Sequence, residues 1–391
     1  MTLFGDYYFF AVAGVLILPA IVLGLLEKNI KYYGFLITLF FIWMAMKEKP
    51  TAIINLAIYC ALELILVKLY LYITKAYNNK GKERNKWLYW VFLILSLMPL
   101  IIWKLSAFSG HSIFAFLGLS YMTFKTAQMI IEIYDGLIEE VNTFEFLYFL
   151  TFFPCLSSGP IDRSRRFHED MERVIPRAEY IEMVGTGLFK VCLGMFYKFV
   201  CAAGLYQAMT WLGAGQRLWN YLIYMYSYGF YLFFDFAGYS LMAVGVSYML
   251  GVKSPDNFNK PFISKDMKDF WDRWHMSLSY WFRDFIFSRF MMKAIKGKWF
   301  KNKLTGASIG FIINMGIMGV WHGLDIYYIM YGLYHGILLA LTEIYQKKCK
   351  LHKKYKKEGW YKALSWFITF NLAMFGFFIF SGKFTQIIGL S

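Results

Sequence analysis

Residues Asp256 to Asp284 read D-N-F-N-K-P-F-I-S-K-D-M-K-D-F-W-D-R-W-H-M-S-L-S-Y-W-F-R-D. This stretch mixes aromatic, charged and hydroxyl side chains inside a chain that is 59% hydrophobic and 21% aromatic, with a mean hydropathy of +0.44. Lipid tails offer no hydrogen-bond partners, so these polar groups must lie at a membrane surface or line a water-filled cavity. The composition therefore predicts an all-α polytopic membrane protein, and the polar stretch predicts where a functional site lies.

Outward from this stretch, most of the chain consists of apolar segments. A membrane helix needs about 20 largely apolar residues. The segment 143–160 is broken by Pro154 and by Gly159-Pro160, so we predict that it is re-entrant and does not cross. About ten full spans remain, and the first is expected to be retained and not cleaved as a signal peptide. The expected segments are 7–26, 32–46, 51–74, 87–105, 112–134, 143–160, 181–212, 217–250, 305–322, 325–346 and 362–381.

The formal net charge of +16 is concentrated in four basic loops. The positive-inside rule places all four in the cytoplasm. Three apolar segments separate the first two loops, so one of the three must fail to cross, which agrees with a re-entrant 143–160. Both termini are then expected to be extracellular. The four loops are 75–86 (with Lys75, Lys80, Lys82, Arg84 and Lys86), 163–177, 289–303 and 347–362.

The residues after Pro261 predict one amphipathic helix that lies at the cytoplasmic boundary of the membrane or dips into the protein. Ser264 is its expected N-cap, and Asp266 lies in the first turn, where a carboxylate is favourable. Asp269 and Arg273 are four residues apart and are expected to pair. Helical spacing puts an aromatic and apolar set on the inward face: Trp271, His275, Leu278, Phe282 and Phe285.

Two polar residues in apolar segments are candidate functional groups. Asp235, in F-F-D-F-A-G-Y-S, either has a functional role or pins a neighbouring helix, and both interpretations stay open. His322 ends an apolar run, directly before Gly323 in G-V-W-H-G. We expect its imidazole to be neutral and able to accept a proton from a hydroxyl group. The alternative for His322 is a hydrogen bond between helices.

No metal site is predicted, because His322 and His335 are not three or four residues apart and no Cys or carboxylate cluster joins them. The chain has no P-loop, G-x-G-x-x-G or G-x-S-x-G motif, so any chemistry must use a donor activated elsewhere. The basic stretch 289–303 either holds anionic lipid headgroups or docks an acidic partner through adaptable Met291 and Met292.

Four motifs, in this order, resemble the membrane-bound O-acyltransferase family: F-F-D-F-A-G-Y-S-L-M-A-V-G at 233–245, D-N-F-N-K-P-F at 256–262, F-W-D-R-W-H-M-S-L-S-Y-W-F-R-D at 270–284 and G-V-W-H-G at 319–323. The resemblance covers roughly residues 110–345, and the hydropathy pattern extends it to nearly the whole chain. It implies one integral membrane domain, 1–391, with re-entrant and interfacial helices around a central passage. Within it we expect N-terminal spans at 1–110, a catalytic core at 111–346, and a basic cytoplasmic loop with the last span at 347–391.

Within this family, S-G-P-I-D-R-S-R-R-F at 158–167 resembles the branch that transfers D-alanine. Alginate O-acetyltransferases usually continue past the R-D of the long motif into a P-L-G-G-N-R-like segment, whereas this chain reads F-I-F-S-R-F-M-M-K at 285–293. The chain also ends soon after its last predicted span. The alternatives are an acetyltransferase of an extracellular polysaccharide, a transporter or exporter without acyl transfer, and a membrane scaffold that docks an acidic partner.

The resemblance implies an acyl transfer without a permanently bound cofactor. D-alanine would arrive as a 4'-phosphopantetheine thioester on an acidic carrier protein (DltC-like), and the acceptor would be (lipo)teichoic acid outside the cell. Other products of the same pathway (DltD- and DltX-like) and membrane lipid are further expected partners, and nucleic acid is not.

Specific positions of this chain match the family's motifs. His322 corresponds to the family's catalytic histidine and His275 to its second histidine. Candidates for the substrate passage are Asp235, Tyr239, Asn257, Arg273, Trp274, Ser277, Trp321 and His335. Candidates for carrier docking are Arg289, Met291, Met292, Lys293 and Lys296, since an acidic carrier favours docking over lipid binding at this stretch.

Overall fold

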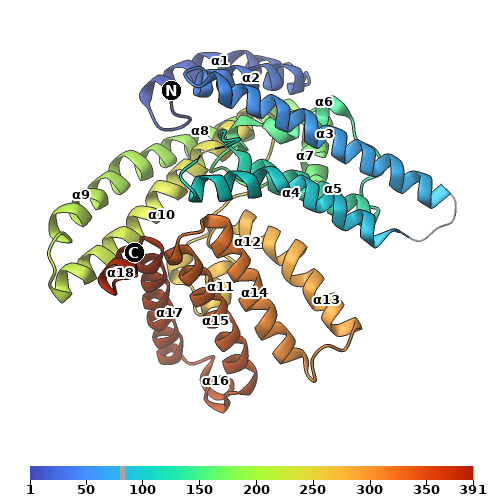
Figure 1. The fold of residues 1–391 in the computed structure, drawn as a ribbon. Coiled ribbons are helices and arrows are strands. Elements are labelled where there is room, and N and C mark those ends of the chain that lie inside the picture. The colour runs from blue at the N-terminus through green and yellow to red at the C-terminus, as the bar shows by residue number, and fades with distance from the viewer. Residues whose placement is uncertain (80–83, 112, 391) are drawn as a thin grey trace. The chain divides into compact units, whose positions relative to one another are not determined.

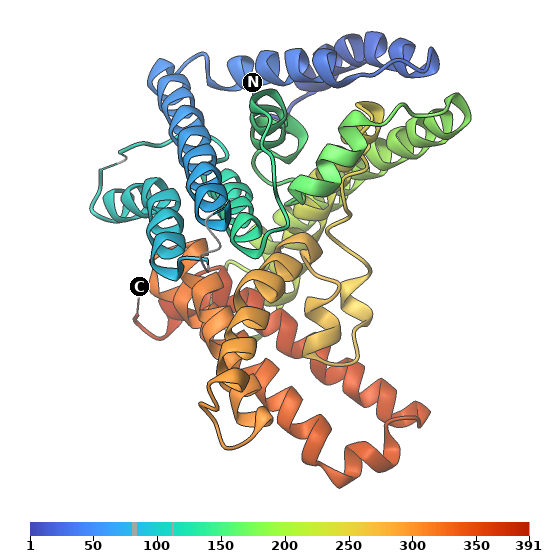
Figure 2. The ribbon, with the colours of Figure 1, turned by 90° about the vertical axis from the view of Figure 1, so that its right-hand side faces the viewer.

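The computed structural model of the chain describes residues 1–79, 84–111 and 113–390, and these residues form helices without a β-strand (Figures 1 and 2). The chain divides into two compact units. Unit 1 comprises Met1–Met195 and Tyr239–Pro255, and unit 2 comprises Phe196–Gly238 and Asp256–Ser391. Of the first predicted basic loop, Lys80 and Lys82 lie outside the described residues.

Unit 1 contains most of the predicted N-terminal segments as separate helices. Several begin at a side-chain N-cap, as at Asp6, which accepts a hydrogen bond from the Phe9 amide at 2.7 Å, and at Asn142. The elements are α1 (Tyr7–Leu25), α2 (Lys31–Met46), α3 (Pro50–Asn79), α4 (Lys86–Phe108), α5 (Leu119–Asp135), α6 (Thr143–Thr151), the 3-10 turn η1 (Phe153–Cys155), α7 (Ser164–Glu172) and α8 (Arg177–Phe196).

The predicted break in segment 143–160 is confirmed. α6 ends at Thr151, one 3-10 turn follows, and the chain is non-helical from there to Ser164. The fully buried Lys125 of α5 donates hydrogen bonds to the carbonyls of Phe149 and Leu150, at 2.8 and 3.3 Å. These carbonyls lie where the helix ends, so Lys125 satisfies acceptors that lipid would leave without a partner.

Unit 2 contains the remaining helices, with α14, α15 and α17 running side by side (Figures 1 and 2). The long helix α10 (Leu218–Met249) contributes residues to both units. The other elements are the π-helical turn η2 (Tyr197–Ala202), α9 (Ala203–Leu212), η3 (Pro261–Ile263), α11 (Met267–Trp271), α12 (Met276–Phe282), the π-helical turn η4 (Arg283–Phe287), α13 (Ser288–Lys296), α14 (Lys303–His322), α15 (Ile326–Lys348), α16 (Lys350–Tyr355), α17 (Gly359–Phe380) and α18 (Lys383–Ile387).

The chain is a multi-pass membrane protein. Among the described residues, seven helices are long and apolar enough to cross a bilayer: α1, α3, α4, the α8–α9 segment (Arg177–Leu212), α10, α14 and α17. The sequence predicted about ten spans. The difference comes from α2, with 16 residues, α5, with 17, and α15, which is long but carries Glu343 and two lysines in its last turns. Sixteen helical residues rise only about 24 Å, which is short of the hydrocarbon thickness.

The prediction of one continuous helix after Pro261 is wrong. The stretch forms two short helices, α11 and α12, separated by a turn that ends at His275. The N-cap is also different, because Asp266 accepts hydrogen bonds from the amides of Lys268 and Asp269, whereas the Ser264 hydroxyl bonds to the Pro261 carbonyl. The predicted ion pair between Asp269 and Arg273 is confirmed at 2.6 Å.

Candidate active site

The turn between α11 and α12 gives His275 an unusual backbone conformation. Its φ of 44° and ψ of 53° lie in the left-handed region, which a histidine adopts only when its surroundings hold it there. The motif D-N-F-N-K supplies the restraint. The Met276 amide donates to the Asn257 carbonyl at 2.8 Å, and the Asn259 amide donates to the Arg273 carbonyl at 3.0 Å. These two bonds bracket His275 and fix the turn.

A side-chain contact adds to the two backbone hydrogen bonds that hold the turn. The Ser277 hydroxyl donates to Asn257 Oδ1 at 2.6 Å, and the Ser277 amide donates to the same oxygen at 3.3 Å. Asn257 is 1% exposed, so this amide is a buried part of the turn and does not line an open passage. Phe258 and Trp274 pair as an isolated antiparallel bridge beside it. Two motifs that are separate in the sequence therefore form one structure.

His275 faces inward, as its position in the sequence predicts. It is buried, and its ring meets the edge of Phe236 with centroids 4.6 Å apart. Burial, with a smaller contribution from His322, lowers the pKa of His275 to about 3. Its imidazole is therefore neutral at physiological pH. The His275 Nε2 atom has no hydrogen-bond partner among the described residues.

His322 is the last residue of α14, and the chain leaves the helix at Gly323 in an extended conformation. Its ring lies against Phe380, with centroids 5.1 Å apart, and stacks at 6.1 Å on Tyr328. Gly319, one turn earlier, packs against α15, and a Cβ atom there would lie 2.5 Å from the Tyr328 carbonyl oxygen. The glycines of G-V-W-H-G thus let α14 approach α15 closely enough to fix His322.

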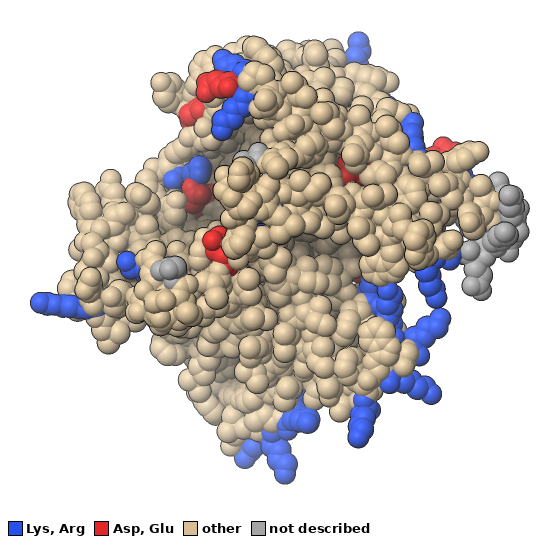
Figure 3. All heavy atoms as spheres, viewed as in Figure 1, with Lys and Arg blue, Asp and Glu red and all other residues tan. Residues whose placement is uncertain are grey.

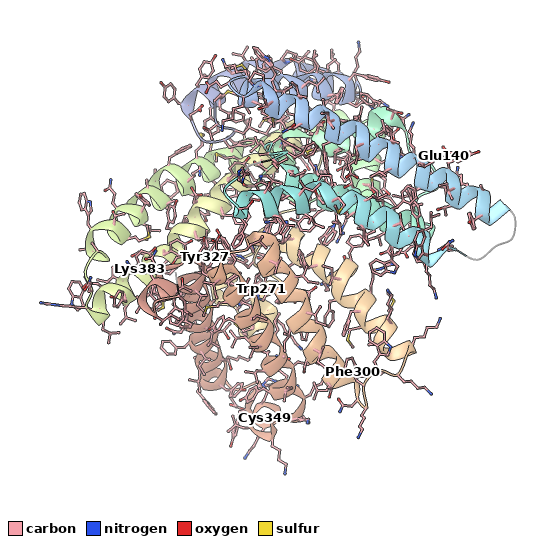
Figure 4. The ribbon with its side chains drawn as sticks, viewed as in Figure 1. Glu140, Trp271, Phe300, Tyr327, Cys349 and Lys383 are labelled. Carbon is pink, nitrogen blue, oxygen red and sulfur yellow. The ribbon has the colours of Figure 1, made fainter. Side chains whose placement is uncertain are left out.

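His275 and His322 line the same cavity, which has a volume of about 50 Å³. A cavity that holds benzene measures about 150 Å³, so this one is too small for a ring-sized group unless its walls move. Trp271, labelled in Figure 4, forms part of the wall. The other lining residues are aromatic or aliphatic: Leu232, Phe236, Trp274, Leu278, Tyr331, Phe377 and Phe380. The site is therefore two imidazoles in an apolar chamber.

His335 lies behind this chamber. It is fully buried, its ring meets Tyr331 at 4.6 Å and Trp271 at 5.2 Å, and it does not line the cavity. Neither of its ring nitrogens has a hydrogen-bond partner among the residues that the structure describes. A Cβ atom on Gly376 of α17 would lie 2.3 Å from His335 Nε2, so this histidine fills a gap between helices. Its arrangement matches packing support for the chamber wall.

The remaining passage candidates occupy different places. Asp235 forms an ion pair with Lys198 of η2, a partner that the sequence did not point to. Tyr239 belongs to unit 1, where its hydroxyl bonds to the Ser157 hydroxyl at 2.7 Å. Arg273 is engaged with Asp269, and the ring of Trp321 lies 4.7 Å from that of His322. Of the eight candidates, Trp274 is the one that lines the histidine chamber.

The docking candidates lie on and around α13. Met292 is 61% exposed, whereas Met291 points toward the first turn of α14, where Gly306 lies. Lys293 and Lys296 are exposed. The sequence missed two further exposed apolar side chains, Ile295 and Trp299, although the three-residue spacing from Met292 to Ile295 was visible. The exposed surface formed by Met292, Lys293, Ile295, Lys296 and Trp299 is called the α13 surface below.

Comparison with known proteins agrees with this geometry. The model of the MBOAT, membrane-bound O-acyltransferase family, matches residues 28–384. This chain belongs to that family. As a member of the family, it is an acyltransferase.

The similarity extends to individual members. The teichoic acid D-alanyltransferase of Bacillus subtilis (strain 168) is 41% identical over 395 residues, which cover 98% of each chain. That of Streptococcus thermophilus (strain ATCC BAA-250 / LMG 18311) is 41% identical over 398 residues, or 97% of this chain and 94% of that protein. The probable alginate O-acetylase AlgI of Pseudomonas aeruginosa is 29% identical over 286 residues, 69% of this chain and 49% of that protein.

Proposed function

We propose that this acyltransferase is a D-alanyltransferase whose acceptor is teichoic acid. The observation that carries the proposal is the chamber with His275 and His322, in a chain that is 41% identical to two teichoic acid D-alanyltransferases over nearly all its length. The acetyl-transfer alternative has less support, because the alginate O-acetylase relative is 29% identical over about half of its own length.

In the proposed mechanism His322 is the general base. It takes the proton from the acceptor hydroxyl as the oxygen attacks the thioester carbonyl of the donor, and the thiol leaves with a proton. His275 touches the same cavity and is neutral, so it is suited to orient the donor through Nε2. The apolar wall excludes bulk water and strengthens the electrostatic contacts inside the chamber.

The donor in this proposal is D-alanine on the 4'-phosphopantetheine arm of an acidic carrier protein. The α13 surface fits such a carrier, because it combines exposed apolar side chains with lysines. Rings from neighbouring segments brace it, since Phe287 stacks on Phe311 of α14 with centroids 4.6 Å apart. The four basic loops, including the one at 289–303 that contains most of α13, would face the cytoplasm by the positive-inside rule, and both termini would be extracellular.

Reconstitution tests the activity and the catalytic assignment together. Purified protein in liposomes receives carrier loaded with labelled D-alanine, and label on teichoic acid is measured for the native chain and for His322→Ala. We expect transfer to fall by about 10³-fold or more, as for loss of a catalytic base, with carrier binding retained. Transfer at the native rate in the variant would refute the role of His322.

Substitutions that change the charge and shape of the α13 surface test whether the carrier protein docks there. Met292→Asp with Lys296→Glu should weaken carrier binding at physiological salt. Lys353→Glu with Lys357→Glu, on the loop around α16, is the control, because it also replaces lysines by acids but leaves the α13 surface intact. Equal binding by both double variants would exclude the α13 surface as the docking site. Labelled acetyl carrier, offered in parallel, distinguishes D-alanyl from acetyl transfer.

A further inference from the structure

A large groove lies in unit 2, away from the histidine chamber. Its volume is about 890 Å³, and it is lined by residues of α15, α16 and α17 and by the residues that lead into α11. None of its lining residues lines the chamber that holds His275 and His322. The proposed acyl transfer therefore gives this groove no role.

The walls of the groove are aliphatic along two helices. Leu364, Ile368 and Leu372 follow one another at four-residue intervals on α17, so they form one stripe about 12 Å long. α15 supplies the opposite wall with Leu338, Leu341 and Ile344. Leu341 and Ile368 are 55% and 48% exposed, so the two stripes are open to the surroundings of the helices. α17 is long and apolar enough to cross the membrane, and a hydrocarbon chain fits beside it.

One end of the groove is basic. Lys265, Lys348, Lys356 and Lys362 line it, and none of these four ammonium groups forms an ion pair within the part of the chain that the structure describes. The carboxylate at this end, Asp266, is already engaged, because it accepts a hydrogen bond from Gln346 at 2.9 Å and caps α11. Figure 3 shows the Lys and Arg side chains that gather at the end of unit 2 where α16 lies.

Polar side chains lie at the same end of the groove as the lysines. The hydroxyls of Tyr345 and Tyr361 are 2.9 Å apart, and His352 Nδ1 lies 3.0 Å from the Tyr361 hydroxyl. All three residues line the groove. The groove thus has cationic, hydroxyl and imidazole groups at one end and aliphatic walls along the rest, which suits an anionic phosphate with its glycerol ester region at one end and an acyl chain beyond it.

We propose that this groove is a binding site for an anionic phospholipid, with the phosphate at the four lysines and an acyl chain along α15 and α17. The charge pattern favours this occupant over others. A soluble phosphate compound would leave the aliphatic walls unused, and a zwitterionic lipid would not neutralise four lysines that have no acidic partner among the described residues. Basic pockets between the ends of membrane helices bind anionic headgroups for this physical reason.

Lipid retention is the direct test. The full-length protein is purified from mixed micelles that hold phosphatidylglycerol and phosphatidylcholine in equal amounts, and the bound lipid is measured by native mass spectrometry. The native chain should retain phosphatidylglycerol preferentially. The triple variant Lys348→Gln, Lys356→Gln and Lys362→Gln should lose this preference, by roughly fivefold for each lysine removed. The matched control, Lys350→Gln, Lys353→Gln and Lys357→Gln, removes the same charge from the same loop outside the groove and should keep it.

A thiol inside the groove gives a second measurement. Cys349 is partly exposed there, and hydrogen bonds from the backbone of His352 and Leu351 lower the pKa of its thiol, so it alkylates readily at neutral pH. Cys349 is labelled in Figure 4 near the same end of unit 2. Its alkylation, followed by peptide mapping, should be slower in phosphatidylglycerol nanodiscs than in phosphatidylcholine nanodiscs.

The outcomes separate the possible occupants. Ile368→Trp fills the aliphatic wall without changing the charge, so it should also reduce phosphatidylglycerol retention if an acyl chain lies there. Protection of Cys349 by glycerol phosphate alone, with retention unaffected by Ile368→Trp, would identify a soluble phosphate and overturn the lipid assignment. The same lipid preference in both triple variants would overturn it as well. All readouts are independent of D-alanyl transfer, so a failure of the proposed activity leaves this test valid.

Discussion

Asn257 and Ser277 are joined by a 2.6 Å hydrogen bond between the Ser277 hydroxyl and Asn257 Oδ1, and this bond ties the segment before α11 to the first turn of α12. Between them the chain makes the turn that holds His275. The geometry of the second histidine therefore depends on a residue that does not line the chamber.

Ser277→Ala tests this dependence. The variant leaves the buried Asn257 oxygen with only the 3.3 Å contact from the Ser277 amide, so stability should fall by about 1–2 kcal/mol. Misplacement of His275 should lower transfer by about tenfold. Thermal unfolding in detergent and the liposome assay measure the two effects. Ser308→Ala is the control, since that hydroxyl bonds to the Leu304 carbonyl of its own helix, and it should change neither.

Substitutions at His275 separate its backbone from its ring. Asparagine tolerates a φ of 44°, whereas valine pays the full steric cost of the left-handed region. We expect the free energy of unfolding of His275→Asn to lie within about 1 kcal/mol of the native value, and that of His275→Val to be lower by about 2 kcal/mol. Transfer should fall in both, because both lack the imidazole. Identical melting of the two variants would show that the turn imposes no strain.

Gly376→Ala tests the packing around His335. The added Cβ would lie 2.3 Å from His335 Nε2, so overpacking should cost about 1–3 kcal/mol. Gly359→Ala, at the start of the same helix, has no heavy atom within 4 Å and should be neutral or slightly stabilising. The added substitution His335→Ala should remove the clash, which a double-mutant cycle measures as a coupling energy. A coupling energy of zero would contradict the contact.

Without Arg166, the stability of unit 1 is expected to depend on pH. Burial raises the pKa of Asp162, and Arg166, which donates to Asp162 Oδ1 at 2.8 Å, partly offsets this. Arg166→Gln would leave a buried carboxylate without its partner, at a cost of about 3–5 kcal/mol at neutral pH.

The sign of this effect follows from the raised pKa. The carboxylate is destabilising only while it is ionised in the folded state, so the stability deficit should shrink as pH falls through the folded pKa toward about 3.9, the value of an unfolded Asp. Unfolding measured between pH 7 and pH 4 tests this. Arg177→Gln removes an exposed arginine of the same unit and should show no such trend. A deficit that stays constant with pH would rule out Asp162 as its source.

The sequence predicted the membrane class, the broken segment and the buried position of His275, because each follows from local composition or spacing. It failed at the α11–α12 turn. The periodicity of Trp271, His275 and Leu278 is that of a helix. The backbone is instead set by hydrogen bonds that Asn257 accepts and Asn259 donates, which join it to a segment 14 to 20 residues earlier in the chain. Contacts between distant segments leave no periodic signal.

The candidate site also combines residues that local motifs identify with residues that only contacts between distant segments bring together. Motifs singled out both histidines and included Phe236, but nothing in the sequence marks Phe236, Tyr331 and Phe380, which come from three different helices, as walls of one chamber. Lys198, the partner of Asp235, lies thirty-seven positions away and was equally invisible. Such partners become identifiable only when helix packing is known.

The small volume of the histidine chamber has a consequence for fidelity. A chamber of about 50 Å³ has no room for a donor group and an acceptor together, so the rings of its wall must move apart before both can reach the two histidines. Water is small enough to enter this chamber, so the apolar wall, and not the volume, must keep water from consuming the activated donor. Substitutions that enlarge the wall, such as Phe380→Ala, should therefore shift the partition ratio of the enzyme from transfer toward hydrolysis before they abolish its activity.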